Sequence, residues 1–131
     1  MPGVIQLDQA LDPEHPPFLE VSTPEGLLSA AQMNVIEFHT WNATKKAIDK
    51  PDRMVFDLDP GEGVKWSFMQ EAAKLVRIFL NELKLVSFLK TSGGKDLHVV
   101  VPIKRLRDWD TVKDFSQAIV ETWRRQSRRV L

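Results

Sequence analysis

The sequence contains no cysteine, and this absence excludes disulfide bonds, thiolate zinc sites and a cysteine nucleophile. No apolar run approaches the roughly 20 residues that a membrane-spanning helix needs, so we expect no membrane association. The N-terminus has no basic residue ahead of an apolar segment. We therefore expect no signal peptide and a cytoplasmic location.

Basic residues are missing from the first third of the chain. No Lys or Arg occurs before Lys45, whereas six of the 18 acidic residues lie before it. The excess of positive charge that follows is densest at Arg124, Arg125, Arg128 and Arg129. Such a split favours a polyanionic partner. The alternative is a solvated helix end, where cations are favoured in any case.

What is present is the composition of one ordinary globular domain. The 131 residues are 43% hydrophobic and 27% charged, which is enough for a core without covalent staples. Four prolines predict an irregular N-terminal arm over residues 1–17. Residues 18–131 are then expected to form a single domain.

The order of the predicted elements indicates an α/β fold of the α+β type. We expect a mixed, largely antiparallel sheet with helices packed on it. Period-two or short apolar runs predict strands over 18–21, 35–41, 54–59, 85–90 and 97–103. Helical spacing predicts helices over 24–33, 67–83 and from Asp108 onward.

Capping signals and apolar stripes locate the two long helices. Ser67 followed by Gln70 fits a capping box, and Asp108 can cap the last helix. The expected buried stripe of the first long helix is Phe68, Ala72, Leu75, Val76, Phe79 and Leu83. The expected stripe of the last is Val112, Phe115, Ile119 and Trp123. The two final strands should pair as a hairpin.

Asp57 and Asp59 form the first candidate site, at the end of an apolar strand. Residues two apart on a strand share a face, so the two carboxylates should converge. Close carboxylates repel, and a divalent cation with a preference for oxygen ligands, Mg²⁺ or Mn²⁺, would neutralise them. The alternative is a strand end at which acids and Pro60-Gly61 only make a turn.

The Gly-rich loop that begins at Ser92 is the second candidate site. Two glycines between strands let backbone N–H groups form an anion nest. Ser92 adds a hydroxyl, Lys95 a positive charge and His98 a ring nitrogen, so together they can hold phosphates. The spacing is not that of a Walker A loop. A plain hairpin turn is the alternative.

His39 is the third candidate, within Glu37-Phe38-His39-Thr40-Trp41. On a strand, Glu37, His39 and Trp41 would share one face. A histidine beside a carboxylate can serve a metal or phosphate site. The alternative is a surface strand with a solvated histidine.

Three motifs in this order resemble a known family. They are E-F-H-T-W-N at 37–42, D-R-M-V-F-D-L-D-P-G at 52–61 and T-S-G-G-K-D-L-H-V-V-V-P at 91–102. Over roughly residues 20–120 the chain resembles the polymerase domain of bacterial DNA ligase D, of the archaeo-eukaryotic primase superfamily. The resemblance implies a partial primase-polymerase fold. It also implies primer extension with ribo- or deoxyribonucleotides during end-joining repair, with Mn²⁺ or Mg²⁺.

The resemblance also implies a role for each matching residue. Asp57 and Asp59 match the metal-binding catalytic pair. Ser92 and His98 match the residues that hold the incoming triphosphate, with Lys95 in the same loop, whereas His39 matches a histidine near metal and triphosphate. The implied partners are a nucleoside triphosphate, DNA ends or a primer-template, and ligase or Ku-type repair proteins. A bacterial, nucleoid-associated protein follows, and exposed apolar surface would favour a homo-oligomer.

The sequence departs from the family pattern in three ways. No residue matches the third metal carboxylate, which in the family follows the last helix. No Lys or Arg lies upstream of His39. Asp96 replaces a loop glycine, where its charge would repel a triphosphate and its backbone would need glycine-like φ values. We therefore predict a fragment of the polymerase domain.

Two other functions are compatible with the same residues. The first is a non-catalytic module of the same ancestry that binds DNA ends or a ligase partner through the basic C-terminal half. The second is a phosphotransferase of the haloacid dehalogenase type, with Asp57 as nucleophile. Pro60 and the Ser92 loop do not fit that second enzyme class.

Overall fold

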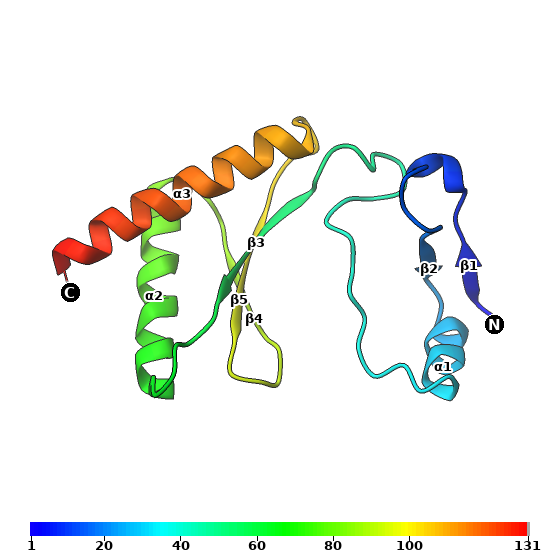
Figure 1. Ribbon diagram of the computed structural model, residues 1–131, viewed down its shortest axis with the longest axis horizontal. Helices are drawn as coiled ribbons and strands as arrows, with labels where there is room; N and C mark the ends of the chain where they lie inside the picture. The colour runs from blue at the N-terminus through cyan, green and yellow to red at the C-terminus, as the bar shows by residue number, and fades with distance from the viewer. Residues whose placement is uncertain (131) are drawn as a thin grey trace. The chain divides into compact units, whose positions relative to one another are not determined.

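The computed structural model describes residues 1–130, and side chains as far as Arg128. Leu131 and the side chain of Arg129, the last member of the predicted basic stretch, lie outside the described residues. The chain divides into two compact units (Figure 1). The N-terminal unit is Met1–Trp41, and the C-terminal unit begins at Asn42.

The N-terminal unit is a strand pair with one helix. β1 (Val4–Gln6) and β2 (Leu19–Val21) pair antiparallel, with a 3₁₀ turn at Gln9–Leu11 between them. The predicted arm over residues 1–17 thus contains β1 and this turn. The helix α1 (Pro24–Gln32) begins after Thr23, whose side chain accepts a hydrogen bond from the first helical turn.

Two glycines allow the beginning of the chain to pack against α1. Gly3 has a φ of +73°, a conformation that L side chains rarely adopt. A Cβ on Gly3 would collide with the backbone of Gly26, and a Cβ on Gly26 with the carbonyl of Gly3. The hydroxyl of Ser29 donates a 2.7 Å hydrogen bond to the carbonyl of Pro2 at the same contact.

The predicted strand over 35–41 is wrong. These residues have no regular secondary structure, and no described strand pairs with them. A period-two pattern needs a partner ladder to become a strand, and here none is formed. The rings of His15, Phe18 and Trp41 instead cluster, with centroids 4.5 to 5.9 Å apart.

The C-terminal unit carries a three-stranded antiparallel sheet and two long helices (Figure 1). Along the chain these elements are β3 (Arg53–Leu58), α2 (Trp66–Glu82), β4 (Phe88–Thr91), β5 (Leu97–Pro102) and α3 (Trp109–Val130). The spatial order of the strands is β3-β5-β4. The predicted α/β class, the antiparallel sheet and the hairpin of β4 with β5 are confirmed.

The core of this unit lies where α2 and α3 cover one face of the sheet. Every second residue of β3 and β5 points toward the helices, as the strand period requires. The buried cluster is Met54, Val76, Phe79, Leu80, Val99, Val101 and Ile119. Leu80 and Val101 have no exposed surface at all. No helix among the described residues is long and apolar enough to cross a membrane.

The predicted apolar stripe of α2 is partly wrong. Val76 and Phe79 are buried as expected, but Phe68 and Leu75 are 52% and 42% exposed. The residues of α2 that are buried are Met69, Ala73, Val76, Phe79 and Leu80. The inward face is therefore rotated by about one residue, because leucines and phenylalanines lie on both sides of the helix and the period alone does not choose between them.

Three other local predictions are corrected. The capping box at Ser67 is wrong, since α2 begins at Trp66 after Lys65, with no side-chain cap. Phe115, expected in the core, is 49% exposed on α3. The strand expected over 85–90 is shifted toward the C-terminus, because β4 begins only at Phe88.

Candidate functional site

A row of polar side chains crosses the sheet on the face away from α2 and α3. Asp57 of β3 is paired with His98 of β5, and His98 is paired on its other side with Lys90 of β4. Directly opposite residues on antiparallel strands share a face. The side chains of Asp57, His98 and Lys90 therefore project from the same face of the sheet.

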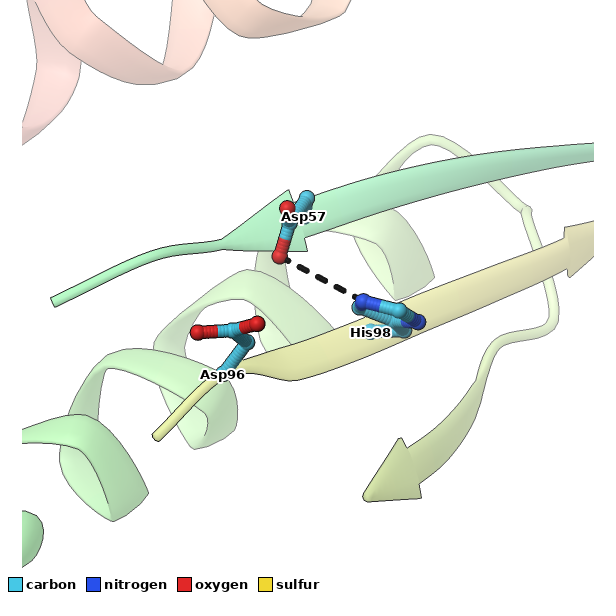
Figure 2. Close-up of side chains that lie close together, drawn as sticks. All are labelled: Asp57, Asp96 and His98. Carbon is cyan, nitrogen blue, oxygen red and sulfur yellow. Dashed lines mark ion pairs between the residues drawn. The ribbon is translucent and has the colours of Figure 1, made fainter. Parts of the chain in front are cut away.

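Asp57 and His98 are in direct contact. The Asp57 Oδ1 lies 3.6 Å from the Nε2 of His98, and Figure 2 shows the imidazole directed at the carboxylate. The side chain of His98 is 28% exposed and that of Asp57 is 59% exposed. The site is thus open to solvent on one side, where a ligand can approach.

Asp96 completes a three-residue cluster. One ligand atom each from Asp57, Asp96 and His98 lies within 4.8 Å of the other two (Figure 2). Asp96 comes two residues before His98, so the turn that precedes β5 brings its carboxylate to the same face. Asp96 does not adopt a positive φ, as the described non-glycine residues that do are Asn34 and Lys84. The expectation that Asp96 needs glycine-like φ values is therefore wrong.

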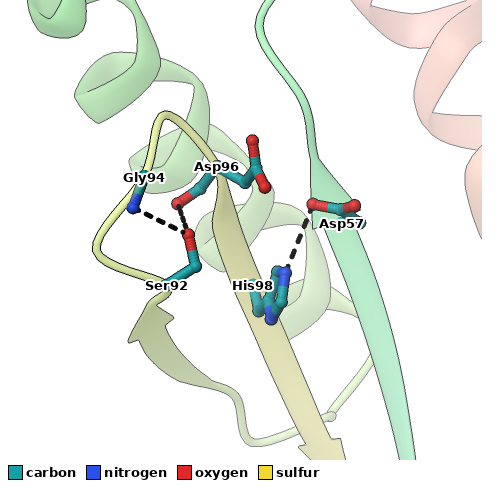
Figure 3. Close-up of polar contacts among 5 residues, drawn as sticks. All are labelled: Asp57, Ser92, Gly94, Asp96 and His98. Carbon is teal, nitrogen blue, oxygen red and sulfur yellow. Dashed lines mark hydrogen bonds and ion pairs between the residues drawn. The ribbon is translucent and has the colours of Figure 1, made fainter. Parts of the chain in front are cut away.

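The Ser92 loop is a tight turn held by its own hydroxyl group. Ser92 Oγ accepts a 3.2 Å hydrogen bond from the N–H of Gly94 and lies 3.5 Å from the carbonyl oxygen of Asp96 (Figure 3). Gly93 takes a φ of +85° at the tip. The hydroxyl is thus engaged within the loop, while the loop delivers Asp96 and His98 to the edge of the sheet.

Asp59 and Lys95 line a neighbouring hollow of about 700 Å³. Asp59 follows the end of β3 and Lys95 comes from the Gly-rich loop, so this hollow lies between the two predicted motifs. Trp66 and Gly94 also line it. Its volume is in the range of small-molecule sites. Asp59 is not a member of the three-residue cluster.

His39 belongs to the N-terminal unit. Its Nε2 lies 3.7 Å from the Oε1 of Glu37, with the two side chains 86% and 70% exposed. The predicted proximity of this histidine to a carboxylate is therefore present, although it arises in an irregular segment and not on a strand.

The donor set on the sheet fits a divalent cation. Two carboxylates supply two negative charges and the oxygen ligands that divalent ions prefer, and a neutral imidazole supplies one nitrogen. The partly buried carboxylate of Asp96 lies within 4.8 Å of that of Asp57. Two like charges this close repel, and a bound cation would offset that repulsion.

The sequence analysis did not include two residues of this arrangement among the candidate site residues. Asp96 was expected only to oppose phosphate binding, and Lys90 was not considered. The register of the hairpin would have predicted the position of Lys90, since a turn between Ser92 and Asp96 puts Lys90 opposite His98. That register follows from the length of the loop, which the two glycines alone do not define.

The family of the chain follows from comparison with known proteins. The model of the LigD primase-polymerase domain matches residues 1–131, which is the whole chain. The chain therefore belongs to the LigD primase-polymerase domain family. Polymerase domains of this family generally depend on divalent metal ions, with which the Asp57 cluster is compatible.

Among curated proteins, the chain is similar to multifunctional non-homologous end joining proteins LigD. It is 54% identical to that of Pseudomonas aeruginosa over 119 residues, which are 91% of this chain and 14% of that protein. It is 40% identical to that of Mycolicibacterium smegmatis over 85 residues, 63% of this chain and 11% of that protein. The chain thus spans a small part of the length of these relatives.

Proposed function

We propose that this chain forms the metal- and nucleotide-binding part of a primase-polymerase site for primer extension during DNA end joining. The observation that carries the proposal is the contact of Asp57 with His98 beside the Gly-rich loop, in a chain of the LigD polymerase family. An acid and an imidazole on adjacent strands, next to a loop of backbone N–H groups, suit a metal-bound triphosphate.

Each candidate residue has a role in this proposal. Asp57 and Asp59 hold the divalent ion, Mn²⁺ or Mg²⁺, which when bound neutralises charge on the reacting phosphate oxygens. Lys95 and His98 bind the triphosphate, and Ser92 stabilises the loop that presents them. For His39, in the N-terminal unit, the resemblance to the family supports a role in binding a triphosphate.

The reaction is nucleotidyl transfer. The 3′-hydroxyl oxygen of a primer forms a bond to the α-phosphorus of the nucleoside triphosphate and gives up its proton to solvent, and the bond to the pyrophosphate oxygen breaks. Cationic groups near the departing pyrophosphate, such as Lys95, stabilise the charge that develops there.

The proposed partners follow from the same function. They are a nucleoside triphosphate, a DNA end or primer-template, and ligase or Ku-type repair proteins, met at the bacterial nucleoid. Exposed apolar residues on α2, including Phe68 and Leu75, also favour self-association as a homo-oligomer.

Nucleotide binding is tested by calorimetric titration of a nucleoside triphosphate with Mn²⁺ into the chain. We expect saturable binding by the unaltered protein and none by an Asp57→Ala, Asp59→Ala double variant, since the two carboxylates that would hold the metal are then lost. An Asp110→Ala, Asp114→Ala double variant on α3 removes the same charge and is the matched control. Equal binding by all three proteins would refute the proposed site.

Catalysis by the chain alone is expected to be slow. No residue of this sequence matches the third carboxylate of the family, and two carboxylates poorly support two divalent ions. We therefore expect metal and nucleotide binding without robust extension of a primed gap in the presence of Mn²⁺ and nucleotides. Robust extension in that assay would contradict this expectation.

A second candidate function is supported by the uneven charge. All basic residues lie at or after Lys45, and Arg124, Arg125 and Arg128 lie close together in α3. A non-catalytic module that binds DNA ends or a ligase partner would use this surface in place of the metal site. DNA binding by such a module would not need Asp57, whereas binding of metal and nucleotide would.

A further inference from the structure

The outer edge of β4 is open in the C-terminal unit. β4 pairs with β5 on one side, and no other described strand pairs with its other side. Alternate residues of an edge strand direct their N–H and C=O groups outward, where an added strand can form hydrogen bonds with them. The four residues of β4 give an edge of about 14 Å. That length is sufficient to pair with a short extended peptide.

The helix layer leaves part of β4 uncovered on its inner face. Leu89 lies directly opposite Val99, which belongs to the buried cluster beneath the helices. Because opposite residues share a face, Leu89 also points to the helix side of the sheet. Leu89 is nevertheless 57% exposed, whereas Val99 is 3% exposed. The core therefore ends at β5, and β4 has apolar surface on the inner face that the described residues leave open.

A groove of about 820 Å³ lies between α2 and β4 at this open surface. Leu89 and Trp66, which is 49% exposed, contribute apolar surface to it. Lys74 and Arg77 of α2 are the charged residues that line it, and no acidic residue is among the described lining residues. Lys74 Nζ also lies 3.3 Å from the Oε1 of Glu71, so we assign the larger part in attracting an acidic ligand to Arg77.

We propose that the groove between α2 and β4 binds an extended acidic segment of a partner protein as an added strand. The backbone of the segment continues the hydrogen-bond ladder of β4, and its apolar side chains cover Leu89 and Trp66. Acidic side chains that alternate with them lie on the other face beside Lys90, and flanking acids lie near Arg77. The inference does not depend on the metal and nucleotide site.

Two other occupants fit the groove less well. A second copy of β4 would bring its own Lys90 to an edge that is already positively charged. A DNA strand would match the charge of Arg77, but its backbone has no N–H groups to donate to the outward carbonyl groups of β4. An acidic peptide satisfies the charge, the apolar surface and the open backbone edge together.

The inference is tested by fluorescence anisotropy of a labelled, end-blocked peptide of alternating valine and glutamate, titrated with the full chain. We expect saturable binding, and none of a peptide of alternating valine and lysine. Lys74→Glu, Arg77→Glu should weaken binding of the acidic peptide by about tenfold or more. Both side chains are exposed, so this variant should fold. Lys104→Glu, Lys113→Glu reverses the same charge elsewhere in the unit and is the matched control.

Hydrogen–deuterium exchange distinguishes strand pairing from the attraction of charges alone. The acidic peptide should slow the exchange of backbone amides in β4, because N–H groups that face solvent become hydrogen bonded. The same peptide with N-methylated backbone amides cannot donate hydrogen bonds to β4 and should bind at least tenfold more weakly, although its side chains and charge are unchanged.

Several results would overturn the inference. They are no binding of the acidic peptide, equal binding by the charge-reversed variant, or unchanged exchange in β4. Displacement of the peptide by a single-stranded oligonucleotide, without slower exchange in β4, would show that the groove binds nucleic acid instead. If the chain dimerises by light scattering and Leu89→Glu prevents dimerisation, a second copy occupies the groove and the inference is wrong.

Discussion

At the scale of single residues, Asp108 forms the helix-capping hydrogen bond that the sequence predicts. Its Oδ1 accepts a 2.8 Å hydrogen bond from the N–H of Thr111, in the first turn of α3. The hydrogen bonds from the Thr111 side chain and backbone hold the pKa of Asp108 below its ordinary value of 3.8. The cap was predicted from the sequence and is confirmed.

Replacement of Asp108 by Ala is expected to destabilise the first turn of α3 at neutral pH. Because the pKa is lower in the folded chain, the stabilisation is present above about pH 3.8 and is lost as the pH falls through the folded value. Thermal unfolding followed by circular dichroism, at pH 7 and at pH 2, measures the difference. Asp110→Ala is the control, and a difference that did not shrink between pH 7 and pH 2 would contradict this account.

The residues of the candidate site were only partly predictable. Asp57 and His98 were identified separately, and the register of β3 with β5 explains why they meet. The sequence did not show that the carboxylate of Asp96 lies beside Asp57 and His98, because that proximity depends on the register of the hairpin.

At the scale of secondary structure, α2 shows the limit of periodicity. Its apolar residues surround more than half of the helix, so the pattern predicted a helix correctly and its inward face imperfectly. Contact with β5 then selects the face that contains Leu80, which is fully buried. Periodicity was also insufficient at residues 35–41. Apolar and polar residues alternate there, but a strand also needs a neighbouring strand with which to pair.

Leu80→Ala should be among the most destabilising changes in the C-terminal unit. It removes a fully buried side chain and leaves a cavity, at a cost of about 2–5 kcal/mol. Ile78→Ala on the same helix is the control, since Ile78 is 55% exposed. Urea unfolding of both variants measures the free energies. A similar loss at both positions would show that this packing of α2 is wrong.

At the scale of the whole molecule, the uneven distribution of charge along the sequence coincides with the division into two structural units. The N-terminal unit contains acids and no Lys or Arg, whereas the C-terminal unit contains every basic residue. The two units thus differ in the sign of the charge that they offer to a polyanion. Composition alone made this predictable, because net charge does not depend on how the chain folds.

DNA binding by the full chain is expected to weaken steeply as salt is raised. Replacing Arg124 and Arg125 with Ala should reduce the slope of log affinity against log salt by about two, because each arginine releases about one counterion. Lys104→Ala, Lys113→Ala removes the same charge elsewhere in the unit and is the control. The measurement is fluorescence anisotropy of a labelled duplex.

The same titration separates the two candidate functions. Binding that survives in Asp57→Ala favours a DNA-binding module, whereas its loss favours a site organised around the metal. If no binding is detected even at low salt, the DNA-binding alternative is excluded and the charge of α3 only solvates a helix end.

The position of β4 affects how the protein behaves when concentrated. In the described part of the chain β4 pairs only with β5, so its other edge carries backbone groups that can pair with a strand of another molecule. Phe88 and Leu89 on this edge are 60% and 57% exposed, which favours pairing with another chain. Lys90 is the only charged residue in β4. The positive charge of Lys90 should repel the same residue of a second molecule and so oppose pairing of two such edges.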